Sequence, residues 1–149
     1  MERVIPVGDE VSWRMLPALI IAWLGLIWVA GWLRWRGLAR TWDRLARMPA
    51  FPATPVEPHH LARLVHIAAH YLPFRSTCLE RSLLLWTWLR RRGYAAELRL
   101  GVCRHSSHLQ AHAWVEYAGN ILNTDPAHAA QYASFDLTDP AALPGRLWS

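Results

Sequence analysis

The chain has 149 residues, about the length of one domain, and 53% of them are hydrophobic while 18% are charged. A chain of this composition has enough apolar residues to form a buried core, so it is not a disordered tail. All 16 basic residues are arginines, against 11 acidic residues, so the net charge is +5 and the isoelectric point is about 10.0. Two cysteines are too few for a disulfide framework or a four-thiolate zinc site.

The first predicted element is an uncharged apolar helix from Leu16 to Leu33. Its length is at the lower limit for spanning a bilayer, so membrane contact and packing within this protein or against a partner both stay open. The arginines that follow would place the rest of the chain in the cytoplasm if the helix spans. The predicted location is therefore cytoplasmic, with association with the cytoplasmic membrane as an alternative. Residues 37–48 are predicted to continue as a basic amphipathic helix.

A proline-rich stretch predicts a division of the chain. Residues 1–48 form the apolar and basic helical segment, residues 49–58 the linker, and residues 59–149 the main domain. The prolines of the linker cannot continue a helix, whereas Pro58 suits the first position of the next one.

That next helix is predicted from Pro58 until just before Pro73, because leucines and other apolar residues recur at helical spacing. Its other face carries His66 and His70, which are four residues apart and could chelate a metal. The Glu of the H-E-x-x-H pattern is missing and no third ligand is obvious, so a solvated face is favoured.

Cys78 is predicted to begin a helix. Thr77 and Glu80 have the spacing of a capping box, with Thr77 as the N-cap, and the helix is expected to end before Gly93. A thiol at a helix N-terminus is favoured as the thiolate, and the free N–H groups there could hold an oxyanion. A small buried side chain at the start of a core helix is the alternative.

A hairpin is predicted after this helix, with strands at 97–103 and 110–117 and a polar loop at 104–109. Cys103 is interpreted as structural. In the second strand, alternation places His112 on one face with Trp114 and Glu116. A two-residue turn at 119–120 and a return strand at 121–124 follow.

Strand pairing tests whether an acid can reach His112. A two-residue Gly119–Asn120 loop would pair Ala118 with Ile121 and Trp114 with Asp125, which places Asp125 on the face of His112. One extra residue in the loop, or a glycine bulge, would bring Thr124 there instead.

The order of a helix-start cysteine, a strand histidine and then an acid is that of papain-like and transglutaminase-like enzymes. The segments CLERSLLLWTWLRRRGYAAELRLGV and AHAWVEYAGNILN, within residues 72–125, resemble the leader peptidases of lasso-peptide biosynthesis in their stand-alone form. These are transglutaminase-like cysteine proteases. The resemblance implies an α+β fold in which the catalytic cysteine, at a helix N-terminus, packs on a small antiparallel sheet preceded by an apolar helical segment.

The resemblance also implies removal of the leader from a ribosomally made precursor peptide, with Cys78 as nucleophile and His112 as base and with no cofactor or metal. Partners would be the precursor, a separate leader-recognition protein and a lasso cyclase. The acid of the family usually follows the histidine by twelve residues, and Thr124 stands there in this chain. Asp125 is therefore predicted as the third member, with Asn123 and Asp136 as further candidates.

Two other functions stay open. The same core could perform a different acyl transfer, as a transglutaminase or an amidase. The chain could instead be a non-catalytic, membrane-associated module that binds an amphipathic peptide. Nucleic-acid binding is not predicted, since the arginines are spread along helices without a known motif.

Overall fold

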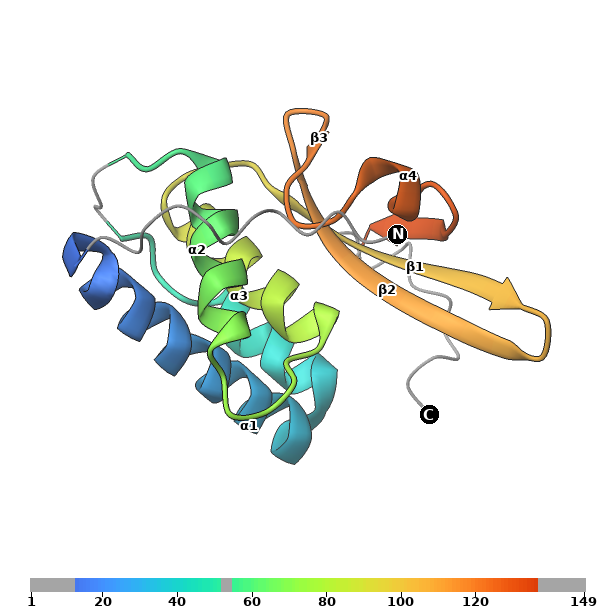
Figure 1. Ribbon diagram of the computed structural model, residues 1–149, viewed down its shortest axis with the longest axis horizontal. Helices are drawn as coiled ribbons and strands as arrows, with labels where there is room; N and C mark the ends of the chain where they lie inside the picture. The colour runs from blue at the N-terminus through green and yellow to red at the C-terminus, as the bar shows by residue number, and fades with distance from the viewer. Residues whose placement is uncertain (1–12, 52–54, 137–149) are drawn as a thin grey trace.

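The computed structural model describes residues 13–51 and 55–136, and the α+β architecture expected from the sequence is confirmed (Figure 1). Helices gather on one side of the molecule, and a sheet with a small additional helix forms the other. The elements are η1 (Trp13–Met15), α1 (Leu16–Ala46), α2 (Pro58–His70), α3 (Cys78–Arg91), β1 (Glu97–His105), β2 (His108–Tyr117), β3 (Asn120–Ile121), α4 (Pro126–Ala129) and β4 (Ala133–Asp136).

The long N-terminal helix α1 packs against both α2 and α3, and all three share the main core with one face of the sheet. Leu26 and Val29 of α1 are fully buried there. The helix is interrupted at Gly37, where φ is 74°. Its second part follows a new direction, and Trp42 stacks on Trp86 of α3 with ring centroids 4.3 Å apart. The predicted helical continuation after residue 37 is thus confirmed, with a kink.

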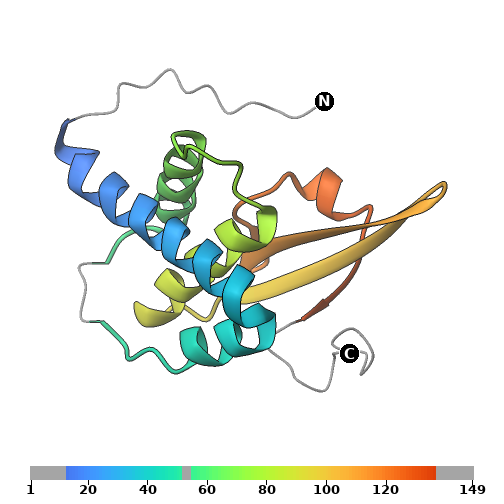
Figure 2. The ribbon, with the colours of Figure 1, turned by 90° about the horizontal axis from the view of Figure 1, so that it is seen from below.

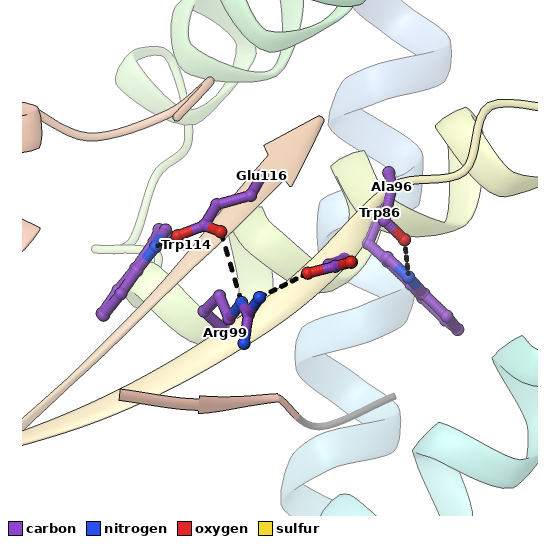
Figure 3. Close-up of polar contacts among 6 residues, drawn as sticks. Trp86, Ala96, Arg99, Trp114 and Glu116 are labelled. Carbon is purple, nitrogen blue, oxygen red and sulfur yellow. Dashed lines mark hydrogen bonds and ion pairs between the residues drawn. The ribbon is translucent and has the colours of Figure 1, made fainter. Parts of the chain in front are cut away.

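Helices α2 and α3 begin where the sequence predicts. Pro58 is the first residue of α2, and Thr77 precedes α3 as its N-cap. At the far end of α3, Trp86 Nε1 donates to the carbonyl oxygen of Ala96 at 3.1 Å, which ties the helix to the chain entering β1 (Figure 3). The helix therefore has a fixed position relative to the sheet at this end.

The sheet is antiparallel, in the order β3-β2-β1-β4. The prediction of a loop over 104–109 is wrong, because β1 continues to His105 and β2 begins at His108. His105 pairs with His108, and Ser106–Ser107 alone form the turn. The polar residues that resembled a loop are exposed strand residues at the tip of a long hairpin.

A second, smaller cluster lies on the opposite face of the sheet, where Trp114 packs with Ala129 of α4 and with Tyr132. Gly101 of β1 makes this packing possible. A Cβ atom at Gly101 would stand 2.6 Å from Cβ of Tyr132 and 2.8 Å from the Trp114 ring. The absence of a side chain at residue 101 thus lets two aromatic rings lie directly on the sheet.

The turn between β2 and β3 differs from the prediction. Ala118 and Gly119 form it, with φ values of 49° and 77°, and Tyr117 pairs with Asn120. The predicted pairing of Ala118 with Ile121 is therefore wrong. Two consecutive positive φ angles are the signature of the tight I′ hairpin turn, in which glycine fits the second position, so the loop begins one residue earlier than expected.

Candidate active site

Cys78 is the first residue of α3, as predicted, and the capping box before it is complete. Thr77 Oγ1 accepts the backbone N–H of Glu80 at 3.2 Å, and Glu80 Oε2 accepts the N–H of Thr77 at 2.8 Å. Glu80 is 3% exposed, so the start of the helix is fixed from within the core. Cys78 is partly buried. The N–H groups of a first helical turn have no preceding carbonyl to bond and point beyond the helix end, where an oxyanion can bind.

His112 lies on β2 and is held by Thr124. The distance from Nε2 of His112 to Oγ1 of Thr124 is 3.0 Å. Because the hydroxyl occupies Nε2, Nδ1 is the ring nitrogen left to exchange a proton with a thiol. The partner of the imidazole is thus the residue twelve positions after it.

Asp125 occupies a different position. Its carboxylate accepts the N–H of Ala127 at 2.9 Å and caps α4, and its side chain is exposed. The predicted pairing of Trp114 with Asp125 is wrong, since β2 and β3 pair as Glu116 with Ile121. The strand then bends away, so the alternation that favoured Asp125 does not extend to it.

The other two candidates for the third member also lie elsewhere. Asp136 is in β4, opposite Arg99 of β1. Asn123 Oδ1 accepts the N–H of Val115 at 2.8 Å, in the place of a backbone carbonyl of a regular ladder, and its Nδ2 donates to Ser82. This inserted amide ends β3 early and lets the next residue turn to His112.

Ser82 connects the two halves of the site. Its hydroxyl is fully buried, donates to the carbonyl oxygen of Ala113 at 3.0 Å and accepts from Nδ2 of Asn123 at 2.8 Å. Ser82 lies one helical turn after Cys78 on α3, and Ala113 and Asn123 are the chain neighbours of His112 and Thr124. One hydroxyl therefore fixes the start of α3 against both segments that carry the histidine and its partner.

His112 is surrounded by rings and by positive charge. Its ring centroid is 5.0 Å from that of His128 and 5.5 Å from that of Tyr132. Burial lowers the pKa of His112 below its ordinary 6.5, and the charges of His128 and Arg81 lower it further. The imidazole is therefore neutral near pH 7 and able to accept a proton.

Trp114 also borders His112, with ring centroids 6.0 Å apart. Glu116 orients this indole, since its Oε1 accepts from Nε1 of Trp114 at 2.9 Å while its Oε2 accepts from Nε of Arg99 at 3.3 Å (Figure 3). The three residues that the sequence placed on one face of β2 do share that face.

Tyr132, the ring neighbour of His112, also responds to the charge of Cys78. Burial raises the pKa of Tyr132, and the negative charges that Cys103 and Cys78 would carry raise it further. Arg81, in the first turn of α3 with Cys78, acts electrostatically on His112. In the part of the chain that the structure describes, no hydrogen bond joins the thiol to His112. Catalytic pairs often close only around a bound substrate.

A cleft of about 480 Å³ opens beside this helix start. It lies between the end of α2 and the beginning of α3, and its walls include His70, Phe74, Arg75, Ser76 and Arg81. His66 and His70 both line it. Within residues 13–51 and 55–136, no group of three or more His, Cys, Asp or Glu side chains comes close enough to hold a metal ion.

The model of the transglutaminase-like superfamily matches residues 23–135, which is most of the chain. The protein therefore belongs to the transglutaminase-like superfamily, whose members are typically cysteine peptidases or transglutaminases. No curated protein and no solved structure is significantly similar to it.

The sequence did not predict α4, which carries His128, or the position of Tyr132 in the turn after it. His128 and Tyr132, four residues apart, both face His112, and Tyr132 Oη lies 3.5 Å from Nε2 of His128. Asp125–Pro126 was interpreted only as the end of a strand. An aspartate followed by a proline is also the pattern of an N-cap and first helical residue, and it would have indicated this helix.

Proposed function

We propose that the protein is a cysteine peptidase that removes the leader from a ribosomally made lasso-peptide precursor. Cys78 is the nucleophile, and His112 is the general base and acid. The proposal is supported chiefly by two contacts: Ser82, one turn after Cys78 on α3, bonds the residue next to His112, and Thr124 engages Nε2 of His112, whose pKa is lowered. The resemblance of the motifs between residues 72 and 125, in their order, to the lasso-peptide leader peptidases favours this activity within the superfamily.

The reaction follows from these groups. Nδ1 of His112 takes the thiol proton as the sulfur of Cys78 attacks the carbonyl carbon of the scissile amide. The N–H groups at the start of α3 stabilise the oxyanion. The imidazolium then protonates the leaving amine, which departs as the new N-terminus of the core peptide. Water, deprotonated by His112, hydrolyses the thioester and releases the leader with a free carboxylate.

The cleft beside α3 suits an extended peptide. It lies next to the residues that precede Cys78, and it combines an aromatic wall at Phe74 with the guanidinium groups of Arg75 and Arg81. We infer that the leader segment before the scissile bond lies in this cleft. A separate leader-recognition protein would deliver the precursor, and a cyclase would use the released amine.

The test is cleavage of a co-expressed precursor, followed by mass spectrometry. Cys78→Ala should abolish cleavage, because alanine cannot form the thioester, while the Cys103→Ala control should retain it. Equal cleavage by wild type and Cys78→Ala would overturn the proposal.

The products separate the remaining functions. A peptidase yields a leader and a core whose masses sum to that of the precursor plus one water. A transglutaminase yields a cross-linked species with loss of ammonia, and an amidase yields a deamidated precursor of full length. A binding module yields none of these and retains peptide in the Cys78→Ala variant as in wild type.

A further inference from the structure

We propose that α1 docks the protein in the plane of an anionic lipid bilayer, through the side that faces away from α2 and α3. In Figure 2, which views the molecule from below, this helix lies in front of the other two. The inference depends on the surface of α1 and is independent of the chemistry at Cys78.

The face of α1 opposite the core is apolar and exposed. Leu16, Ile20 and Leu24 recur every four positions along α1. Trp13 precedes them in η1, and Trp35 follows eleven positions later, about three helical turns, so the five side chains lie along one stripe. We call this the outer stripe: Trp13 (74% exposed), Leu16 (50%), Ile20 (55%), Leu24 (55%) and Trp35 (88%). A helix with apolar residues on both faces normally has both faces covered. Here the protein covers only one face of α1. In the most apolar 18-residue stretch of the helix, 22% of the residues are buried.

The charges and aromatic residues around the outer stripe match a lipid surface. Tryptophans stand at both of its ends, and helices that lie in the membrane interface carry such side chains on their apolar face. Arginines flank the stripe, and Asp43 is the single acidic residue of α1. Exposed arginines beside an apolar face are attracted to anionic headgroups. The exposed ones are Arg14, Arg34, Arg36, Arg40 and Arg44.

The packing of α1 favours an in-plane position over a spanning one. By length and composition the helix could cross a membrane. However, α2 packs along it and exposes His59, Arg63 and His70 on its own outer face. If α1 spanned the bilayer in this packing, those polar side chains would enter hydrocarbon. Lying flat, α1 immerses only the outer stripe, and the sheet stays on the aqueous side of α2 and α3.

Flotation of the full-length protein with vesicles tests the docking. Vesicles of phosphatidylcholine with 30% phosphatidylglycerol should carry the protein, and phosphatidylcholine vesicles should carry at least tenfold less. The double variant Ile20→Glu with Leu24→Glu should lose binding to anionic vesicles by at least tenfold. Leu109→Glu is the matched control, because it removes a 76% exposed leucine at the hairpin tip, and it should float as wild type does.

Two measurements keep the result interpretable. Circular dichroism establishes that the double variant is folded, and a fluorophore on Ile20→Cys, in a background without Cys78 and Cys103, should shift to the blue on anionic vesicles even if the double variant unfolds. An impermeant maleimide added outside sealed vesicles should label both Met15→Cys and Arg34→Cys. Protection of one end would indicate spanning and overturn the in-plane geometry. Self-association through the outer stripe without vesicle binding, or equal flotation of all variants, would overturn the docking.

Discussion

The imidazole of His112 is held by a hydroxyl group, that of Thr124, at 3.0 Å. A carboxylate in this place would favour the imidazolium and raise the pKa of the histidine, whereas a neutral hydroxyl does not. Burial lowers the pKa of His112, and the positive charges of His128 and Arg81 lower it further. The residue is therefore set up as a neutral base that takes a proton only when the thiol attacks.

The pH profile of kcat/KM should reflect this environment. Because the base must be neutral, activity should rise through the pKa of His112, with a midpoint below the ordinary 6.5. His128→Gln removes the side chain whose charge lowers the pKa of His112 and should move this acidic limb to higher pH, while His59→Gln, on the outer face of α2, should not. A limb at or above 6.5 in wild type would contradict the assignment.

The lowered pKa of His112 also makes the free energy of unfolding depend on pH. Between the lowered pKa and 6.5, the unfolded chain binds a proton at residue 112 that the folded chain does not. The contribution of His112 to the free energy of unfolding is therefore fully present above pH 6.5 and is lost as the pH falls through this window.

Substitutions at 124 and 125 should separate the two candidates for the third member. Thr124→Val keeps the shape but removes one neutral hydrogen bond of about 0.5–1.5 kcal/mol, so kcat should fall about two- to thirteenfold. Asp125→Asn keeps an N-cap for α4 and should leave kcat within twofold. A larger loss for Asp125→Asn in a steady-state assay would show that the carboxylate acts on His112 during turnover.

The sequence predicted the positions of Cys78 and His112 because both depend on local signals, a capping box and strand alternation. It named Thr124 only as the alternative to Asp125, for a turn of different length. That contact depends on the turn at Ala118–Gly119 and on the amide of Asn123 entering the ladder, and strand parity alone reveals neither.

At the scale of elements, α3 takes the place of a strand beside part of β2. The sheet continues past β2 only over the short β3, and farther along this edge the hydroxyl of Ser82 bonds the outward carbonyl of Ala113. Because a helix stands where a further strand would be, the helix that begins at Cys78 packs against the strand that carries His112. This arrangement also makes Ser82 a positioning residue for the pair.

Ser82→Ala should lower kcat about tenfold or more with little change in KM, because it removes the hydrogen bonds that hold α3 to Ala113 and Asn123 and leaves the lining of the cleft unchanged. Thr87→Val is the matched control. Thr87 is also a buried hydroxyl of α3, but it bonds the Leu83 carbonyl within the helix at 2.7 Å. Unfolding curves for both variants would separate lost stability from lost positioning, and equal losses of kcat would refute the positioning role.

The helices and the main hairpin were predictable to within a few residues. Prolines, a capping box and Gly93 mark the helix ends, and alternation marks the strands. The edge strand β4 and the helix α4 were not predicted. Both are short, and their positions depend on the packing of Tyr132 and Trp114 over Gly101, a contact between residues distant in sequence.

At the scale of the whole molecule, α1 is part of the core as well as of the surface. Leu26 is fully buried against α2 and α3, while Leu24, two residues earlier, is 55% exposed. The superfamily match also begins within this helix, at residue 23. One face of α1 therefore packs in the core and the other is exposed, so substitutions can test the two faces separately.

Leu26→Ala should reduce the free energy of unfolding by about 2–5 kcal/mol, since it leaves a cavity in the main core. Leu24→Ala should change it by less than about 0.5 kcal/mol. Urea unfolding followed by circular dichroism in the absence of lipid measures both. If the two variants lose the same stability, α1 is a detachable appendage and not a wall of the core.

A row of unpaired amides at a sheet margin can recruit the same margin of a neighbouring molecule and start a fibre. On this protein, side chains close the β2 margin at two points, where Ser82 bonds Ala113 and where Asn123 bonds Val115. The opposite margin is the short β4, residues 133–136. Among the described residues, both margins are thus covered near the core, and a neighbouring sheet would find its template at the exposed tip of the β1–β2 hairpin.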